Sequence, residues 1–473
     1  MSTRTARVLF ALLAVTLTLP GAAAAQVVDA TADIDWRDEI AYQRGIQAMV
    51  WAMPAVSMLD LRDAFFSLGS GYNTVYYISE VPTALQEALT ANNQTPYANI
   101  VLDTREGPMV LDVPPATDRT AIFGSAVDVF QVPVADVGPA GTDAGKGGRY
   151  LFIPPDFTGS VPDGFFPVQL DTYEVYVALR LIPLGDATYA EAAGYAEELN
   201  AYPVTQAAAP PAGTHIDFAG QHLPTLPTYD LSTFERIAEL VETEPVLEDD
   251  AIMRGMLASI GIARGQTFEP DETLRDALSR AAADGKRYLD YTFVTPGYSL
   301  ESYYDGRQWQ ALREPSEEGF VFDEGPNLLI DERGSFFHWL TFVPRQLGAA
   351  TAYLVALRDA DGALLDGASS YRLRVPNGVP ARDFWSVIAY SMETKAWIYS
   401  DLGRVGLSSY DTDSMALNDD GSMDLYFGPT APDGLEENWI PTGEDFFLLF
   451  RFYGPDEAYF DKSFVLPDME RIR

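Results

Sequence analysis

The chain has 473 residues, no cysteine, and 69 acidic against 31 basic residues, for a formal net charge of -38. The lack of cysteine excludes disulfides, thiolate metal sites and a cysteine nucleophile. Binding nucleic acid requires clustered cations, and the chain has four lysines, Lys146, Lys286, Lys395 and Lys462, so nucleic acid is excluded as a partner. The acidic balance favours a role in solubility over divalent-cation binding, because no local pattern marks a cation site.

The N-terminus has the pattern of a secretory signal peptide. Arg4 and Arg7 precede an apolar run over residues 8–19, and small residues follow up to Ala25. The run is shorter than the roughly 20 residues of a membrane-spanning helix. We therefore expect residues 1–25 to be a signal peptide. We also expect the protein to be periplasmic or extracellular and to have no integral membrane segment after cleavage.

The first half of the chain changes from helical to β-type patterning. Residues 26–90 form an N-terminal helical region, with apolar positions at spacings of three and four, where Pro54 should kink or end the helix. Residues 91–205 contain short β-type runs broken by Gly, Pro and Asp. This part is predicted to be an N-terminal β-rich domain.

The second half repeats this alternation. Residues 206–230 open on an Ala- and Pro-rich stretch and are predicted to be a linker. Residues 231–295 form a helical segment, whose last helix should begin near Asp271 and end at Gly285. Residues 296–473 are predicted to be a C-terminal β-sandwich domain. The fold class is therefore mainly β with α: two β-sandwich or jelly-roll-like domains separated by a helical segment.

Two acidic turns in the last domain predict β-hairpins. Residues 359–362 read Asp-Ala-Asp-Gly and residues 419–421 read Asp-Asp-Gly, and Asp and Gly accept the positive φ that such turns require. Calcium binding is disfavoured because the ligand spacing of an EF-hand loop is missing. No cofactor is predicted, and a divalent cation has no support from spacing.

Several motifs of the chain resemble known families. The C-terminal half has, in order, Arg382-Asp383-Phe384-Trp385-Ser386, Tyr390, Asn438-Trp439-Ile440-Pro441, Arg451 and Tyr453-Gly454-Pro455. The N-terminal half has Asn92, Gln94, Thr95 and Tyr97, and later Asp128 and Arg180. Together they resemble proteins that combine the domain-of-unknown-function families 1254 (N-terminal) and 1214 (C-terminal), although the family pattern has Asp where Gln94 stands. The biochemistry of this family is not established, so the resemblance implies no reaction.

Two arginines lie in strands that are otherwise apolar. Alternation over residues 445–453 gives, from Phe446 onward, two faces that are apolar except for Arg451, and Arg180 lies in a similar apolar run within residues 173–182. A buried guanidinium needs partners. The favoured interpretation is a structural ion pair, for Arg451 with Asp383 or Asp445. The alternative is a clamp for the carboxylate or phosphate of a ligand. The candidate ligand-binding residues are Tyr97, Arg180, Asp383, Trp385, Asn438 and Arg451.

Catalytic patterns are sparse. The chain has three histidines, His215, His222 and His338, and no Gly-x-Ser-x-Gly elbow. His338, in an expected aromatic strand over residues 336–339, is interpreted as a core histidine. The aromatic residues 298–309 are interpreted as packing in preference to sugar binding.

The leading hypothesis is binding of a small molecule or glycan at the rims of two β-rich domains. The alternatives are a carboxylate-based hydrolase acting on carbohydrate and a structural or oligomer-forming module, including a homo-oligomer.

Overall fold

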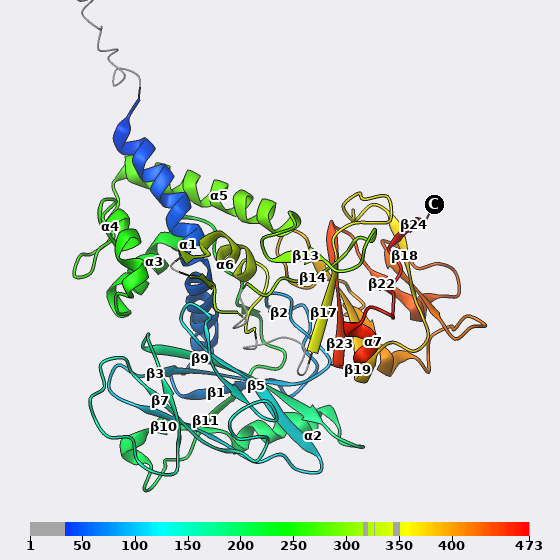
Figure 1. Cartoon of the computed structure of the whole chain (residues 1–473), viewed down its shortest axis with the longest axis horizontal. Coiled ribbons are helices and arrows are strands. Elements are labelled where there is room, and N and C mark those ends of the chain that lie inside the picture. Colours follow the sequence, from blue (N-terminus) through cyan, green and yellow to red (C-terminus); the bar gives the residue numbers. More distant parts are fainter. Residues whose placement is uncertain (1–33, 316–319, 326, 344–350, 473) are drawn as a thin grey trace, which may run out of the picture.

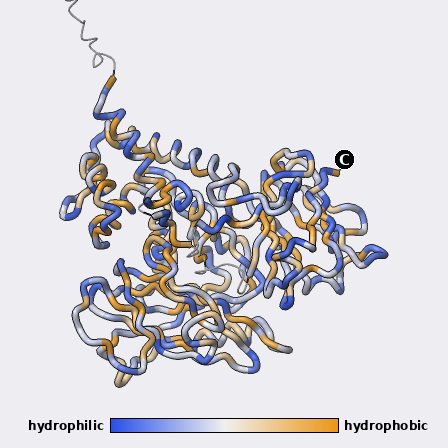
Figure 2. Tube along the Cα trace, viewed as in Figure 1, coloured by the Kyte–Doolittle hydropathy of each residue, from blue (hydrophilic) through white to orange (hydrophobic). Residues whose placement is uncertain are grey.

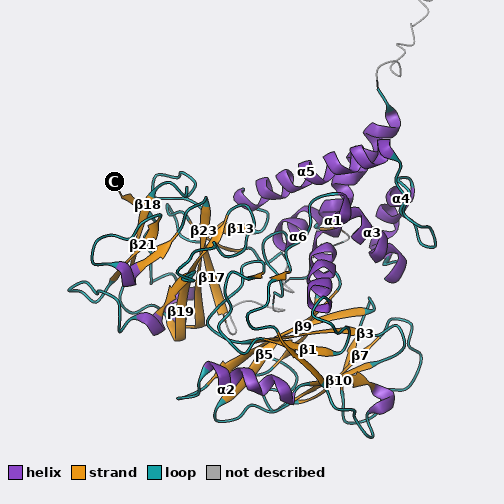
Figure 3. Ribbon diagram, turned by 180° about the vertical axis from the view of Figure 1, so that it is seen from behind, coloured by secondary structure: helices purple, strands orange, loops and turns teal. Residues whose placement is uncertain are grey.

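The computed structural model describes residues 34–315, 320–325, 327–343 and 351–472. Two β domains lie against a shared group of helices (Figures 1 and 3). The fold class predicted from the sequence, mainly β with α, is confirmed. The predicted signal peptide, residues 1–25, lies outside the described residues. Within the described ranges, no helix is long and apolar enough to cross a membrane.

The group of helices joins segments from three parts of the chain. Asp35 caps the first helix by accepting the N–H groups of Arg37 and Asp38. The long helices α1 and α5 cross each other, and α3 and α6 contact α1 beside them. The helices are α1 (Trp36–Phe66), α3 (Leu231–Thr243), α4 (Ala251–Ala258), α5 (Glu272–Val294) and α6 (Ile330–Phe337), with the short α2 (Tyr189–Gly194) and α7 (Glu457–Phe460) in the β domains.

Pro54 lies inside α1 and does not end it, although the helix changes direction along its length (Figure 1). A proline inside a helix removes one backbone donor and displaces carbonyl groups of the preceding turn. The carbonyl of Trp51 accepts a hydrogen bond from Arg333 Nη2 at 3.1 Å, and the carbonyl of Pro54 accepts one from Gln131 Nε2 at 3.1 Å. Side chains from α6 and the β5–β6 turn thus donate to two carbonyls at or near the proline.

Glycines set the close approach of α1 and α5. A Cβ atom on Gly45 would lie 2.6 Å from Ala281 Cβ, and one on Gly285 would lie 2.5 Å from Met49 Sδ. The prediction that the last helix ends at Gly285 is wrong, because α5 runs on to Val294. Gly285 does not end the helix; its lack of a side chain lets α5 pack closely against α1.

The first β domain consists of two sheets with a hydrophobic core between them. The six-stranded sheet has the order β11-β1-β3-β9-β5-β6, and the four-stranded sheet has the order β10-β4-β7-β8. The strands are β1 (Thr74–Tyr77), β3 (Tyr97–Asp103), β4 (Met109–Val113), β5 (Thr120–Asp128), β6 (Pro133–Val137), β7 (Gly148–Ile153), β8 (Phe166–Gln169), β9 (Glu174–Pro183), β10 (Asn200–Pro203) and β11 (Thr214–Asp217).

The stretch 206–230, which the sequence predicts to be a linker, contains strands of the first domain. β11 pairs in parallel with β1, and β12 (Leu223–Pro224) pairs in parallel with β2 (Gln86–Glu87). Such short strands take their stability from the neighbouring strand, so they leave no periodicity in the sequence. Similarly, region 26–90, predicted to be helical, includes β1 and β2.

The second β domain has the same layout of six and four strands, in the orders β13-β14-β17-β23-β19-β20 and β22-β21-β18-β24. Both predicted hairpin turns are present, with Gly362 at φ 84° and Gly421 at φ 78°. Apolar residues follow the inner strands and helices, whereas many loops are polar (Figure 2). The strands are β13 (Leu300–Ser302), β14 (Trp309–Leu312), β17 (Thr351–Ala356), β18 (Ser370–Val375), β19 (Ala381–Ser391), β20 (Gly406–Ser408), β21 (Met423–Gly428), β22 (Trp439–Pro441), β23 (Phe446–Pro455) and β24 (Glu470–Ile472), with a small pair β15 (Asp323–Glu324) and β16 (Asn327–Leu328) beside α6.

Candidate functional site

Two arginines from different β domains share a group of tyrosines where the domains meet. Arg451 lies on β23 of the second domain and is 2% exposed. Its Nη1 donates to Tyr390 Oη at 2.7 Å, and its Nη2 donates to the carbonyl of Thr90 at 2.6 Å. Its Nε has no hydrogen-bond partner among the described residues. Arg451 therefore joins the second domain to a segment of the first half of the chain, and its Nε–H is not used in this contact.

Arg180, on β9 of the first domain, lies between two tyrosine rings. Its Cζ atom is 4.8 Å from the ring centre of Tyr97, on the neighbouring strand β3, and 5.9 Å from that of Tyr453, on β23. Its Nη1 makes a long contact of 3.4 Å to Thr95 Oγ1. Arg180 as a residue is partly exposed. Aromatic contacts hold the guanidinium from both domains and leave most of its N–H groups available.

Neither arginine forms an ion pair within the described residues, where no carboxylate oxygen lies within 4.0 Å of either one. The predicted pairing of Arg451 with Asp383 or Asp445 is wrong. Asp383 pairs with its exposed neighbour Arg382, and Asp445 Oδ1 accepts the N–H of Gly367. Both acids belong to the rims of the sheet, whereas Arg451 points from the middle of β23 toward the first domain.

The protonation states make this cluster positive. Burial raises the pKa of Tyr390 and of Tyr453 to about 12, and nearby Arg451 opposes the rise in both. Burial acts to lower the pKa of Arg180, but the surrounding tyrosines keep that pKa above its usual value. The tyrosines therefore stay neutral and the guanidinium stays charged near pH 7. A positive site thus exists inside a strongly acidic protein.

The segment before β3 connects the two arginines. The N–H of Thr90 donates to the carbonyl of Lys395 at 2.9 Å, and the carbonyl of Ala91 accepts Tyr390 Oη at 2.6 Å. Asn92 follows, is 1% exposed, and donates from Nδ2 to Thr95 Oγ1 at 3.4 Å. Thr95 Oγ1 is the same atom that Arg180 contacts. The asparagine amide and the guanidinium of Arg180 therefore converge on one hydroxyl.

The other three predicted site residues lie elsewhere. Trp385 faces the core of the second domain and stacks on Phe450 at 5.4 Å, because alternation along β19 turns it away from Arg451. Asn438 is buried and bonds to both the N–H and the carbonyl of Ala416, which makes it a structural residue. Asp383 is exposed at the rim beside Gly454. Only Tyr97, Arg180 and Arg451 of the six come together.

Five further residues of the site were not predicted: Asn92, Thr95, Tyr353, Tyr390 and Tyr453. Tyr353 is the cross-strand neighbour of Arg451, and its ring centre lies 6.0 Å from Arg451 Cζ. Asn92, Thr95, Tyr390 and Tyr453 belong to the motifs that carry the family resemblance. Tyr453 is two residues from Arg451, so strand alternation alone could have placed it on the same face.

His338 is a buried histidine, as predicted, but it caps helix α6 and is not in a strand. Its Nδ1 lies 2.6 Å from Tyr229 Oη, and its Nε2 lies 2.9 Å from Asp290 Oδ1. Burial lowers the pKa of His338 to about 4, so the imidazole is neutral near pH 7. Both ring nitrogens are thus occupied inside the protein.

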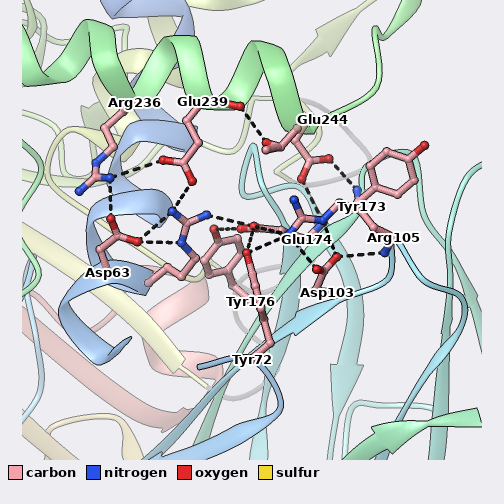
Figure 4. A network of polar contacts seen from close by, with 12 residues as sticks. Asp63, Tyr72, Asp103, Arg105, Tyr173, Glu174, Tyr176, Arg236, Glu239 and Glu244 are labelled. Atoms are coloured by element: carbon pink, nitrogen blue, oxygen red, sulfur yellow. Dashed lines mark hydrogen bonds and ion pairs between the residues drawn. The ribbon is translucent and has the colours of Figure 1, made fainter. Parts of the chain in front are cut away.

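A second polar cluster joins α1 and α3 to the first sheet (Figure 4). Glu174, at the start of β9, accepts hydrogen bonds from Arg62 Nη1 at 3.0 Å and from Tyr176 Oη at 2.5 Å. Burial raises the pKa of Glu244 to about 7, and its oxygens accept the N–H groups of Tyr173 and Glu174. Glu174 and Glu244 are each 1% exposed. Both acids are buried and hydrogen-bonded within the protein, so the cluster gives the hydrolase hypothesis no support.

The aromatic segment after α5 is held by packing. Tyr303 and Tyr304 donate to the carbonyls of Tyr459 and Phe464, and Trp309 Nε1 donates to the carbonyl of Pro467 at 2.8 Å. A groove of about 280 Å³ beside it is lined by Tyr303, Tyr304, Asp305, Arg307, Lys462 and Val465. The rings of Tyr303 and Tyr459 stack with their centres 5.0 Å apart, and Lys462 Nζ lies 4.7 Å from the ring centre of Tyr303. The ring of Tyr303 already contacts Tyr459 and Lys462, which disfavours stacking of a sugar on it.

The fold defines a protein of two two-sheet domains that share a group of helices, with an arginine site between them. Residues 72–203 match the family described as Protein of unknown function (DUF1254), and residues 350–457 match Protein of unknown function (DUF1214). The chain belongs to the proteins that combine these two families. Arg180 lies in the first matched region and Arg451 in the second, so the site lies where the two families meet.

Two solved structures were compared with this chain. The VPA0106 protein of Vibrio parahaemolyticus is 18% identical and gives a TM-score of 0.54, over 92% of this chain and 100% of that one. This likeness supports the fold alone. An uncharacterized protein from Burkholderia cenocepacia is 10% identical with a TM-score of 0.39, over 92% of this chain and 94% of that one. No curated protein matches the chain.

Proposed function

We propose that the protein is a binding protein for a carboxylate-bearing small molecule or glycan, which it holds between its two β domains. The observation that supports this function is the pair Arg180 and Arg451, which have no carboxylate partner among the described residues. The proposal also includes export, because the first 25 residues have the pattern of a signal peptide.

Arg180 and Arg451 lack a counter-charge within the described residues, as does the buried Arg333, whose Nη2 donates to the carbonyl of Trp51. Removing a guanidinium from water has a penalty of several kcal/mol, which a carboxylate partner normally offsets. The chain has 69 acidic residues, and Arg62 illustrates the usual solution by pairing with Glu174 and Glu239. At Arg180 and Arg451, tyrosine hydroxyls, carbonyls and rings surround the charge. An anionic ligand would supply the counter-charge that the protein omits.

The geometry favours a planar anion. Rings of Tyr97 and Tyr453 lie near Arg180, and its guanidinium retains N–H groups with no partner among the described residues. The N–H groups of a guanidinium point outward in its plane and match the two oxygens of a carboxylate. The aromatic surroundings also suit the apolar face of a sugar or a ring.

Substitution of Arg180 by Met tests the proposal. Calorimetric titration and thermal shifts should be measured with D-glucuronate, citrate, benzoate and inorganic phosphate. We expect at least one of these anions to raise the melting temperature of the wild-type protein. We expect Arg180→Met to weaken its binding by about 10- to 100-fold, the effect of about 1.5–3 kcal/mol for hydrogen bonds to a charged group. Arg180→Met should fold, because it leaves no acid unpaired.

The matched control is Arg149→Met. Arg149 lies on β7 of the same domain and also contacts an aromatic ring, with its Cζ 4.3 Å from the ring centre of Phe165. This control should bind the anion as the wild type does. If none of the four anions stabilises the wild-type protein, or if Arg180→Met binds as tightly as Arg149→Met, the proposed function is wrong.

A further inference from the structure

We infer that the ligand is a hydroxylated carboxylate, such as a sugar acid, and that Asn92 and Tyr453 recognise a hydroxyl group beside its carboxylate. This inference rests on the proposed function and specifies its ligand class. It rests on polar atoms at the site that have no hydrogen-bond partner in the described part of the chain.

Three such atoms belong to residues of the arginine site. Asn92 Oδ1, Tyr453 Oη and Arg451 Nε are buried and make no hydrogen bond to any described residue. Asn92 is 1% exposed, Tyr453 3% and Arg451 2%. Buried polar atoms are nearly always hydrogen-bonded, so each of these three atoms requires an explanation. Each lies on a residue that the arginine site already includes.

These atoms are held in place by their neighbours. The Asn92 amide is oriented by its Nδ2 contact to Thr95 Oγ1 at 3.4 Å. The Tyr453 ring stacks on Phe384 with ring centres 3.9 Å apart and an angle of 14° between the planes. A stacked ring and an anchored amide cannot turn easily toward another protein partner. Their free atoms are therefore preorganised for a group that comes from outside.

A hydroxyl group has the hydrogen-bonding chemistry that both atoms lack. The amide oxygen of Asn92 needs a donor, whereas the phenol of Tyr453 can donate or accept. A hydroxyl does both and is neutral. An ammonium group would also donate, but Arg180 and Arg451 both lie near Tyr453 and would repel it. The site thus combines charge recognition by arginine with hydroxyl recognition by Asn92 and Tyr453.

The test compares D-glucuronate with cyclohexanecarboxylate, which has a similar ring and carboxylate but no hydroxyls. Affinities of both anions should be measured by calorimetry for the wild type, Tyr453→Phe, Asn92→Leu and Arg180→Met. We expect the wild type to prefer glucuronate by at least about tenfold, since sites with buried hydrogen-bonding groups reject analogues that lack the matching group. Arg180→Met should weaken the binding of both anions.

Tyr453→Phe is the sharper variant, because Tyr453 Oη makes no hydrogen bond to the described residues and its removal should not unfold the protein. We expect this variant to lose about three- to tenfold in glucuronate affinity and to keep its affinity for cyclohexanecarboxylate. Asn92→Leu should act in the same direction, with folding checked by thermal unfolding.

The outcomes separate the two proposals. Equal wild-type affinity for the two anions, with loss of both in Arg180→Met, would overturn the hydroxyl inference and leave anion binding intact. The hydroxyl inference is equally overturned if Tyr453→Phe weakens the binding of both anions to the same extent. Failure of the wild type to bind either anion would count against this ligand class and, together with the four-anion panel, against the proposed function.

Discussion

Replacing Asp128 by Asn should change how the stability of this protein depends on pH. Asp128 ends β5, is 5% exposed, and accepts the N–H groups of Phe130 and Val132 on the same oxygen, Oδ1, at 2.9 and 2.8 Å. Burial raises the pKa of this carboxyl from 3.8 to about 7, although both backbone donors and Arg333 oppose the rise. Asparagine keeps the accepting oxygen and removes the titration.

The expected size follows from the two pKa values. Because the folded-state pKa lies above the unfolded one, this group stabilises the fold fully below about pH 4, and the contribution disappears as the pH rises through about 7. Each pKa unit corresponds to about 1.4 kcal/mol, so roughly 2–3 kcal/mol is lost between pH 5 and pH 8. The asparagine side chain of the variant does not titrate, so the variant should not show this loss.

The free energies of unfolding of the wild type and Asp128→Asn should be measured by urea unfolding at pH 5, 6, 7 and 8 and compared. The stability of the variant relative to the wild type should rise by about 2–3 kcal/mol across this range. Glu244, whose pKa is also raised to about 7, titrates in both proteins, but the charge of Asp128 contributes to that rise, so the substitution also lowers the Glu244 pKa and adds to the difference in the same direction. Asp118→Asn, at an exposed acid before β5, controls for the loss of one negative charge. Parallel stability curves for wild type and Asp128→Asn would refute the reasoning.

Two further substitutions test the packing and the buried charges. Gly45→Ala places a Cβ 2.6 Å from Ala281 Cβ and should destabilise the α1–α5 contact by about 1–3 kcal/mol. Its control, Gly255→Ala, changes an exposed helical glycine with open space around it and should be neutral or stabilising. Thermal unfolding measures both variants, and equal effects would contradict the close-approach argument. Arg62→Met leaves the buried Glu174 without its main counter-charge and should lower the free energy of unfolding by about 3–5 kcal/mol. The control Arg374→Met removes one partner of an exposed ion pair and should lower it by less than about 1 kcal/mol. If urea unfolding shows a loss for Arg62→Met as small as for Arg374→Met, the buried pair contributes little to stability.

The sequence was informative where structure depends on local patterns. Alternating apolar runs and Asp-Gly turns predicted the mainly β fold, and Asp271 was recognised as the start of α5, whose Leu274 N–H it accepts. The alternation of β23 also marked Arg451 as unusual. Such signals come from residues a few positions apart, where strand pleat, helical turn and capping fix the geometry.

Local patterns misled where a residue serves a distant partner. Gly285 looked like a helix end, but it makes room for Met49 on α1. Residues 206–230 looked like a linker, but β11 is stabilised by pairing with β1. In both cases the deciding contact comes from a segment far away in the chain, which a single sequence does not reveal.

The sequence by itself determined which residues could form the site: two arginines within apolar strands and tyrosines at the positions of the family motifs. It also excluded a disulfide bond between the domains, because the chain has no cysteine. Only the tertiary structure decided that Arg180 and Arg451 share tyrosines from both domains, with Asn92 and Thr95 between them, and that neither has a carboxylate partner in the described part of the chain. Charge pairing depends on distances between side chains of separate sheets, and those distances are set by how the two domains dock and not by the order of residues along either strand.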